Sequence, residues 1–104
     1  MNNTTLGRNG FGDEDPINNN EVRLCKDWIK KWITKRKTIN EKKGSYCLKH
    51  AVERNNSNYI SNGAFIQAAI DLGYSYRVSG PNAFFNMSFV DAKRNLEKSN
   101  YYGM

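Results

Sequence analysis

The sequence contains a single histidine, His50, and only two cysteines, Cys25 and Cys47. One imidazole cannot form a two-histidine acid–base pair, and these three side chains are one short of the four ligands that a closed zinc site needs. A disulfide framework in a small secreted domain usually contains more cysteines. We therefore expect two reduced cysteines on the apolar faces of helices, no metal site and no cofactor.

Motifs for catalysis are missing too. The sequence has neither a Gly-x-Ser-x-Gly segment for an activated serine nor a glycine-rich phosphate loop. A cluster of acids at residues 13–15 lies in a polar segment, where nothing fixes the geometry of the carboxylates. These absences favour a binding protein over an enzyme, and we predict no catalytic residue.

Long apolar runs are absent as well, because no stretch approaches the roughly 20 apolar residues that cross a membrane. Residues 1–10 also lack the apolar segment of a secretory signal. We expect a cytoplasmic protein without a membrane partner. At 104 residues, the chain has the length of one domain.

Positive charge is abundant and concentrated in one part of the chain. The sequence has 16 Lys and Arg residues against 10 acids, for a net charge of +6. Residues 21–54 alone hold eleven of these cations and four of these acids, which gives that segment a charge of +7. A concentrated basic surface favours a polyanionic partner, nucleic acid first, with a merely solubilising surface as the alternative.

The N-terminal part of the chain divides into a tail and a long helix. Residues 1–17 are rich in Asn, Gly and Asp and are predicted to form a flexible tail, because they cannot bury enough apolar surface to offset their ordering. Asn18 and Glu21 form a capping box at the start of a helix that extends to about residue 37. From Thr34 to Asn40 the apolar period is lost, and we expect the helix to fray there into a basic linker.

Two shorter helices are predicted next. Ser45 is placed to cap a helix that ends near Arg54, with Lys49 facing the solvent. Ser61 is placed to cap the central helix, which Gly73 ends in a left-handed conformation. The central helix has an apolar face for the core and is predicted to leave its polar residues Asn62, Gln67 and Asp71 outside.

After residue 73 the period changes to two, which is typical of strands. Residues 74–79 and 84–89 alternate around a turn at Gly80, Pro81 and Asn82. If Pro81 and Asn82 are the central turn residues, Val78 pairs with Phe85. A short C-terminal helix then begins at about residue 88, and residues 100–104 form a tail.

We predict from this layout a small α+β, winged-helix-like domain over residues 18–99, with three helices, a two-stranded hairpin, a short C-terminal helix and a flexible N-terminal tail. Its second and third helices are the nearest match to a helix-turn-helix, although the connection is longer than the 3–4 residues of that motif. The central helix would offer Asn62 and Gln67 to bases, and the hairpin would be the wing. The cations would contact mainly phosphates. The predicted nucleic-acid-binding residues are Lys30, Lys31, Lys35, Arg36, Lys37, Lys42, Lys43, Lys49, Arg54, Asn62, Gln67 and Arg77.

Three segments, residues 45–50 (SYCLKH), 59–66 (YISNGAFI) and 81–88 (PNAFFNMS), resemble a family of small proteins of phages and integrative mobile elements. The resemblance covers residues 45–88 and implies a mobile-element setting, without an activity to carry over. We therefore expect a small, basic, non-catalytic protein that binds nucleic acid, DNA before RNA. The alternative is an accessory protein that binds and inhibits a host defence nuclease complex through the weakly charged face around Gly63, Ala64 and Ala68.

Overall fold

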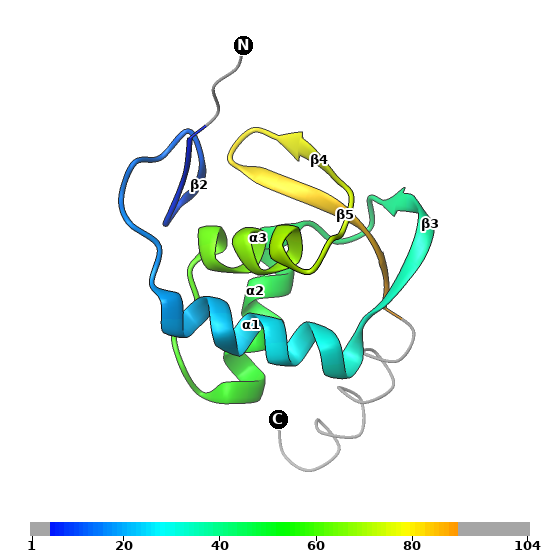
Figure 1. The fold of residues 1–104 in the computed structure, drawn as a ribbon, viewed down its shortest axis with the longest axis horizontal. Coiled ribbons are helices and arrows are strands. Elements are labelled where there is room, and N and C mark those ends of the chain that lie inside the picture. Colours follow the sequence, from blue (N-terminus) through cyan, green and yellow to red (C-terminus); the bar gives the residue numbers. More distant parts are fainter. Residues whose placement is uncertain (1–4, 90–104) are drawn as a thin grey trace.

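The computed structural model describes residues 5–89, which form a small α+β domain with three helices and antiparallel sheets (Figure 1). The elements in chain order are β1 (Leu6–Gly7), β2 (Gly10–Phe11), α1 (Asn19–Trp32), β3 (Thr34–Asn40), α2 (Ser45–Asn56), α3 (Asn62–Asp71), β4 (Tyr76–Ser79) and β5 (Asn82–Ser88). The C-terminal helix and tail that the sequence predicts fall, from residue 90 onward, outside the described residues.

Helix α1 begins as predicted and ends earlier. The Asn18 side chain accepts hydrogen bonds from the N–H groups of Asn20 and Glu21, at 2.8 and 3.1 Å, and so caps the first turn. The Glu21 carboxylate accepts from the N–H of Ser61, at 3.0 Å, and thereby joins the starts of α1 and α3. The helix ends at Trp32 and not near residue 37, because the next residues join a sheet.

Residues 34–40 form strand β3, so the predicted basic linker is wrong. This strand pairs antiparallel with β5, with Thr34 opposite Ser88, Lys35 opposite Met87 and Asn40 opposite Phe85. The four residues 36–39 therefore lie opposite one residue of β5, and β3 bulges out of the sheet there. Its β-branched residues suit a strand, and β5 offers an edge on which they can pair.

The hairpin of β4 and β5 exists, but its register differs from the prediction by two residues. Ser79 pairs with Asn82 and Tyr76 with Phe85, so Gly80 and Pro81 are the central turn residues. Gly80 has a φ of +60°, which a glycine at the first position of a two-residue hairpin turn accepts readily. A register shift of two residues leaves each side chain on the same face of the sheet. The strand order in this sheet is β3-β5-β4.

The predicted flexible N-terminal tail differs most from the structure. Within residues 5–17, β1 and β2 pair antiparallel into a small hairpin, here called the N-terminal hairpin. Its backbone docks onto the domain: the N–H of Gly63 donates to the carbonyl of Arg8, and the N–H of Phe11 to that of Pro81, both at 2.9 Å. The Phe11 ring also stacks on Tyr76, with the ring centroids 5.9 Å apart. Hydrogen bonds from backbone groups hold this segment on the domain although it has few apolar side chains.

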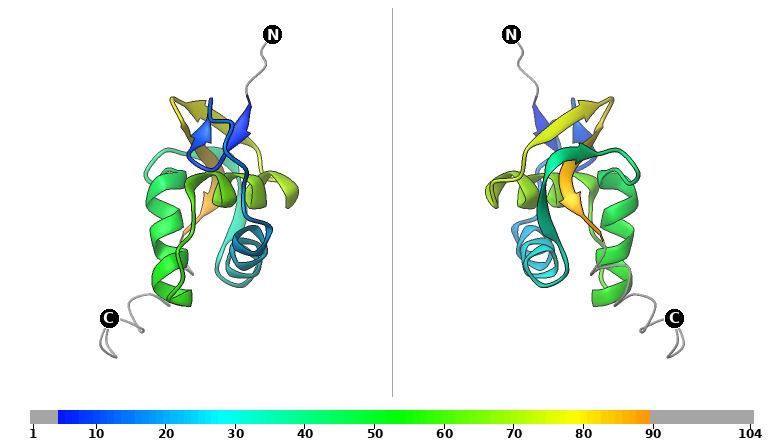
Figure 2. Two further views of the ribbon diagram at one scale, coloured as in Figure 1. Left: turned by 90° about the vertical axis from the view of Figure 1, so that its left-hand side faces the viewer. Right: turned by 90° about the vertical axis from the view of Figure 1, so that its right-hand side faces the viewer.

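Helix α3 is the centre of the core. Its Phe65 ring meets Trp28 of α1 and Phe85 of β5 edge-on, at centroid distances of 6.3 and 5.8 Å. Figure 2 shows the N-terminal hairpin and the β4–β5 hairpin on one side of α3, with α1 and α2 on the other. Helix α3 is thus covered from both sides.

Candidate nucleic-acid interface

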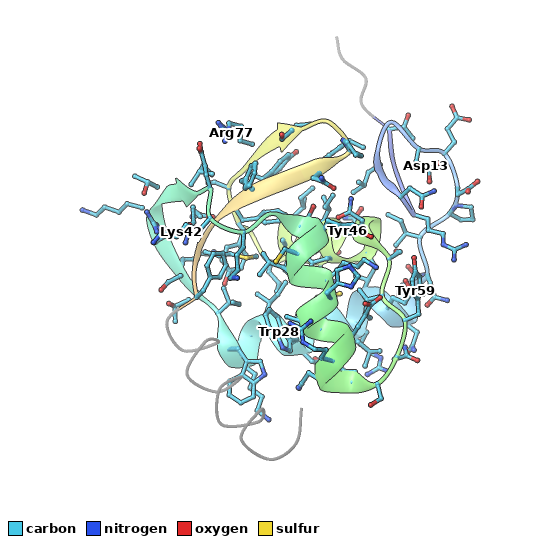
Figure 3. All side chains as sticks on the ribbon, turned by 180° about the vertical axis from the view of Figure 1, so that it is seen from behind. Asp13, Trp28, Lys42, Tyr46, Tyr59 and Arg77 are labelled. Atoms are coloured by element: carbon cyan, nitrogen blue, oxygen red, sulfur yellow. The ribbon has the colours of Figure 1, made fainter. Side chains whose placement is uncertain are left out.

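Five exposed cations gather on β3 and the turn that follows it, here called the basic arm (residues 34–43). These cations are Lys35, Arg36, Lys37, Lys42 and Lys43. Figure 3 shows Lys42 at the edge of the molecule, on the opposite side of α2 from Tyr59. Within residues 5–89, none of the five is ion-paired with an acid. The arm therefore presents a concentrated positive surface to the solvent.

The one acid of the arm is neutralised from the neighbouring hairpin. Glu41 forms an ion pair with Arg77 of β4, whose guanidinium also lies over the Phe84 ring, 5.4 Å from its centroid. Arg77 was predicted to contact nucleic acid, but its charge is already partnered. Its guanidinium neutralises the charge of Glu41, so the five cations of the arm are not offset by that acid.

The remaining predicted phosphate contacts differ in position. Lys30 and Lys31 lie in the last turn of α1, which leads into the arm through Ile33, and both are exposed. Arg54 is exposed as well, but it lies nine residues along α2 from the end that joins the arm. At about 1.5 Å per residue, this distance is about 14 Å. Lys30 and Lys31 can extend the basic surface of the arm, and Arg54 is set apart from it.

Lys49 is buried, so its predicted exposure to solvent is wrong. Its Nζ forms an ion pair with Glu53 at 3.1 Å and lies 5.1 and 4.9 Å from the ring centroids of Tyr46 and Tyr59. A carboxylate and two π-faces replace the water around this ammonium group. The sequence pattern gives no signal for Tyr46 and Tyr59, because Tyr59 comes from the segment that follows α2 and reaches Lys49 only in the folded chain.

Of the two predicted base readers of α3, Asn62 is turned into the protein and Gln67 stays at the surface. Asn62 is buried, and its Nδ2 donates to the carbonyl of Asn9 (3.2 Å), the carbonyl of Pro81 (3.3 Å) and the Oδ1 of Asn82 (2.9 Å). Gln67 is half-buried, and its side-chain amide donates to Asp71 at 2.7 Å. Asn62 therefore joins three parts of the fold.

The face of α3 that was predicted to suit a protein partner is also covered. Gly63, Ala64 and Ala68 are all buried. A Cβ added to Gly63 would overlap the backbone carbonyl of Gly7 in the N-terminal hairpin. The N-terminal hairpin covers this face at Gly63, so the prediction that the face is open at the surface is wrong.

Two residues of α2, Cys47 and Ser45, also differ from prediction. Cys25 is buried in the core as expected, and Cys47 is exposed. Ser45 does not cap α2, since Gly44 is the N-cap residue and the Ser45 hydroxyl instead accepts from the N–H of Ala83 at 3.1 Å. In the part of the chain that the structure describes, no group of three or more His, Cys, Asp or Glu side chains could hold a metal ion.

In comparisons with known proteins, no protein-family model, curated protein or solved structure matches this chain. Between residues 5 and 89, no helix has both the length and the apolar character needed to cross a lipid bilayer.

Proposed function

We propose that this chain is a small, non-catalytic, winged-helix-like protein that binds DNA mainly through the phosphate backbone, with the basic arm as its principal contact. The observation that carries the proposal is the basic arm itself: five exposed cations within residues 34–43, with the only acid among them, Glu41, paired to Arg77. Clustered cations that have no acid partner are the electrostatic footprint of a polyanion-binding surface.

The order of the elements supports the winged-helix part of the proposal. A helix, a strand, two helices and a two-stranded hairpin follow one another from α1 to β5, and β5 pairs with β3 as well as with β4. In this layout the hairpin is the wing. The usual reading helix, α3, is covered here by the N-terminal hairpin, which is why we place binding on the arm.

A backbone-binding mode follows from which side chains are available. Phosphate contacts need cations, while sequence readout needs polar groups that can reach base edges. The cations of the arm are exposed, whereas Asn62 is buried and the Gln67 amide is bonded to Asp71 on its own helix. We therefore expect strong salt dependence and little preference among duplex sequences.

The test is the salt dependence of binding to a fluorescently labelled, mixed-sequence 20-base-pair DNA duplex, followed by anisotropy. In the variant Lys42→Gln/Lys43→Gln, two phosphate contacts are lost, so the slope of log affinity against log salt should become shallower by about 2. A matched RNA duplex, tested in parallel, should bind more weakly. Exchanging the DNA sequence for an unrelated one should leave the affinity unchanged.

The matched control is Arg23→Gln/Arg54→Gln, which removes two exposed cations outside the arm. This variant has the same net charge as Lys42→Gln/Lys43→Gln. Its slope should stay close to that of the parent. Equal slopes for the two double variants would show that DNA binding depends only on the total charge of the protein. The basic arm would then not be the interface. Absence of DNA binding by the parent at low salt would reject the function itself.

A further inference from the structure

Strand β4 is one of the two outer strands of its sheet, and all of its residues are exposed (Figure 1). In an antiparallel pair, the backbone groups of successive residues point alternately toward the neighbouring strand and away from it. The N–H of Asn86 in β5 donates to the carbonyl of Ser75, so Ser75, Arg77 and Ser79 are the residues that face β5. The N–H and C=O groups of Tyr76 and Val78 therefore point to the open side of the sheet.

These outward groups present a template for a further strand. Within residues 5–89, β4 pairs with β5 alone, and no backbone hydrogen bond from another element reaches Tyr76 or Val78. A row of N–H and C=O groups of this kind is what an added strand pairs with. β4 contains neither a proline nor a bulge that would block the addition.

The side chains of the same two residues extend the apolar face of the sheet beyond its cover. Tyr76 lies opposite Phe85 and Val78 opposite Ala83, so all four point to the face on which α3 packs. Phe85 and Ala83 are fully buried, whereas Tyr76 and Val78 are 43% and 46% exposed. A strand added to β4 would cover them with its own side chains.

The charge on β4 is already neutralised. Its one charged residue, Arg77, lies opposite Phe84 on the other face of the sheet and is paired with Glu41. An edge without net charge, with apolar side chains two residues apart, is complementary to a strand of the same kind and gives no advantage to a strongly charged one. β4 itself is a strand of this kind.

A second copy of β4 fits this edge in one antiparallel register. With Arg77 on the two-fold axis, Tyr76 of each copy lies opposite Val78 of the other, and the outward N–H and C=O groups of both residues are paired. An aromatic ring opposite a β-branched side chain is also a favourable cross-strand pair. A register shift of two residues would instead set Tyr76 opposite Gly80 of the turn, or Val78 opposite Tyr74, which is buried.

We propose that this chain forms a two-fold symmetric dimer in which β4 pairs with β4 of a second copy, so that the two three-stranded sheets become one. Because the same edge of both copies is used, assembly through it ends at two. The two basic arms then lie on the outermost strands, five strand spacings or about 24 Å apart. The dimer does not need nucleic acid, so it can fail separately from the proposed function.

Sedimentation equilibrium of the full chain without DNA tests the dimer. So short an edge gives a small interface, so the protein is examined from about 10 μM to about 1 mM, where weak complexes assemble. We expect a monomer–dimer equilibrium without larger species. Amide hydrogen exchange at both ends of this range then locates the interface. The N–H groups of Tyr76 and Val78 should slow as the dimer forms, by a larger factor than those of Arg77 and Ser79, which already face β5.

Variants test the edge and the register. Val78→Lys places a charge on the edge and should keep the protein monomeric. Thr38→Lys is the matched control, because it makes the same change in net charge at an exposed residue of the other outer strand, β3, and should leave the dimer unchanged. Glu41→Gln leaves the two Arg77 side chains opposite each other without an acid, and it should raise the dissociation constant roughly 2- to 5-fold.

Three results would overturn the proposal. A parent that stays monomeric up to about 1 mM would reject the dimer and leave the edge to a strand of a different protein. A dimer that Val78→Lys does not weaken, or that slows no exchange at Tyr76 and Val78, would use another surface. An unchanged dissociation constant in Glu41→Gln would move Arg77 away from the axis and reject the register.

Discussion

Gly63 of α3 and Gly7 of β1 lie in direct backbone contact. The N–H of Gly63 donates to the carbonyl of Arg8, and a Cβ added at Gly63 would overlap the backbone carbonyl of Gly7. The lack of a side chain at Gly63 is what allows the N-terminal hairpin to approach α3 this closely. This contact covers the helix that a winged-helix protein would usually present to DNA.

Gly63→Ala should therefore destabilise the protein by about 1–3 kcal/mol, as overpacking does. Helix propensity alone predicts the opposite sign, because Ala in a helix is favoured over Gly by about 1 kcal/mol. Urea unfolding measures the difference, and hydrogen exchange should show faster exchange in residues 5–17. A more stable variant would mean that the hairpin does not dock on α3.

A second prediction compares the buried amide of Asn62 with the half-buried amide of Gln67 on the same helix. Asn62→Ala removes the donor shared by Asn9, Pro81 and Asn82, and it should lower the free energy of unfolding by about 1–3 kcal/mol. Gln67→Ala is the control, since it loses only a hydrogen bond to an exposed carboxylate and should stay within about 0.5 kcal/mol of the parent. Equal effects in urea unfolding would contradict the burial of Asn62.

A third prediction concerns acid stability. Burial on its own raises the pKa of Glu53, but hydrogen bonds from the N–H of Ile60 and from Lys49 and His50 outweigh it, so the pKa of Glu53 lies below its ordinary value of 4.5. A carboxyl whose pKa is lower in the folded state stabilises the fold above pH 4.5, and this contribution is lost as the pH falls through the folded-state pKa.

Glu53→Gln should consequently be less stable than the parent at pH 7, by about 1.5–3 kcal/mol for a hydrogen bond to a charged group. The gap between the two proteins should narrow below pH 4.5. Urea midpoints at pH 7, 5 and 3 provide the measurement. A gap that stays constant down to pH 3 would show that the ionised Glu53 is not the source of the stability.

The two cysteines should react at very different rates. Burial, together with the nearby carboxylates of Glu21 and Glu53, raises the pKa of Cys25 to about 12, so its reactive thiolate is scarce near neutral pH. Cys47 is exposed and accessible to reagent. Brief treatment of the native protein with iodoacetamide should modify Cys47 alone, and both thiols should react in urea. Mass spectrometry after digestion locates the label, and modification of Cys25 in the native protein would contradict its place in the core.

The parts of the fold that the sequence predicts are those that local patterns determine. The Asn18 cap, the Ser61 cap and the left-handed Gly73 each depend on neighbouring residues, and all three are confirmed. The helix face that carries Phe65 and Ile66 is also confirmed as core. Periodicity and caps act within one or two turns, so a single sequence contains enough information to find them.

The parts that were missed depend on pairing across the chain. Nothing near Thr34 shows that β5, about 50 residues later, offers it an edge. Gly7 and Gly10 carry no apolar signal, and yet their backbone packs on α3 and the β4–β5 turn. The two-residue shift in the register of Tyr76 came from the choice of Pro81 as the first turn residue, whereas Gly80 takes that position.

The candidate site was predicted in part. The exposed lysines of the arm were identified from charge alone, because unpaired cations in a polar segment are usually on the surface. Lys49 and Asn62 were not recognised as buried, because the groups that partner them come from distant segments. Polar residues are assigned to the surface by default, and only the tertiary structure shows which of them have internal partners.

The bulge in β3 has a consequence for self-association. β3 is an outer strand, and outer strands are where another chain can add by hydrogen bonding. Residues 36–39 leave the plane of the sheet, so the regular row of N–H and C=O groups that an added strand requires is interrupted there. The lysines of the strand also repel a second copy of themselves. The bulge and the charge of β3 therefore disfavour the pairing of two copies of this chain through that edge.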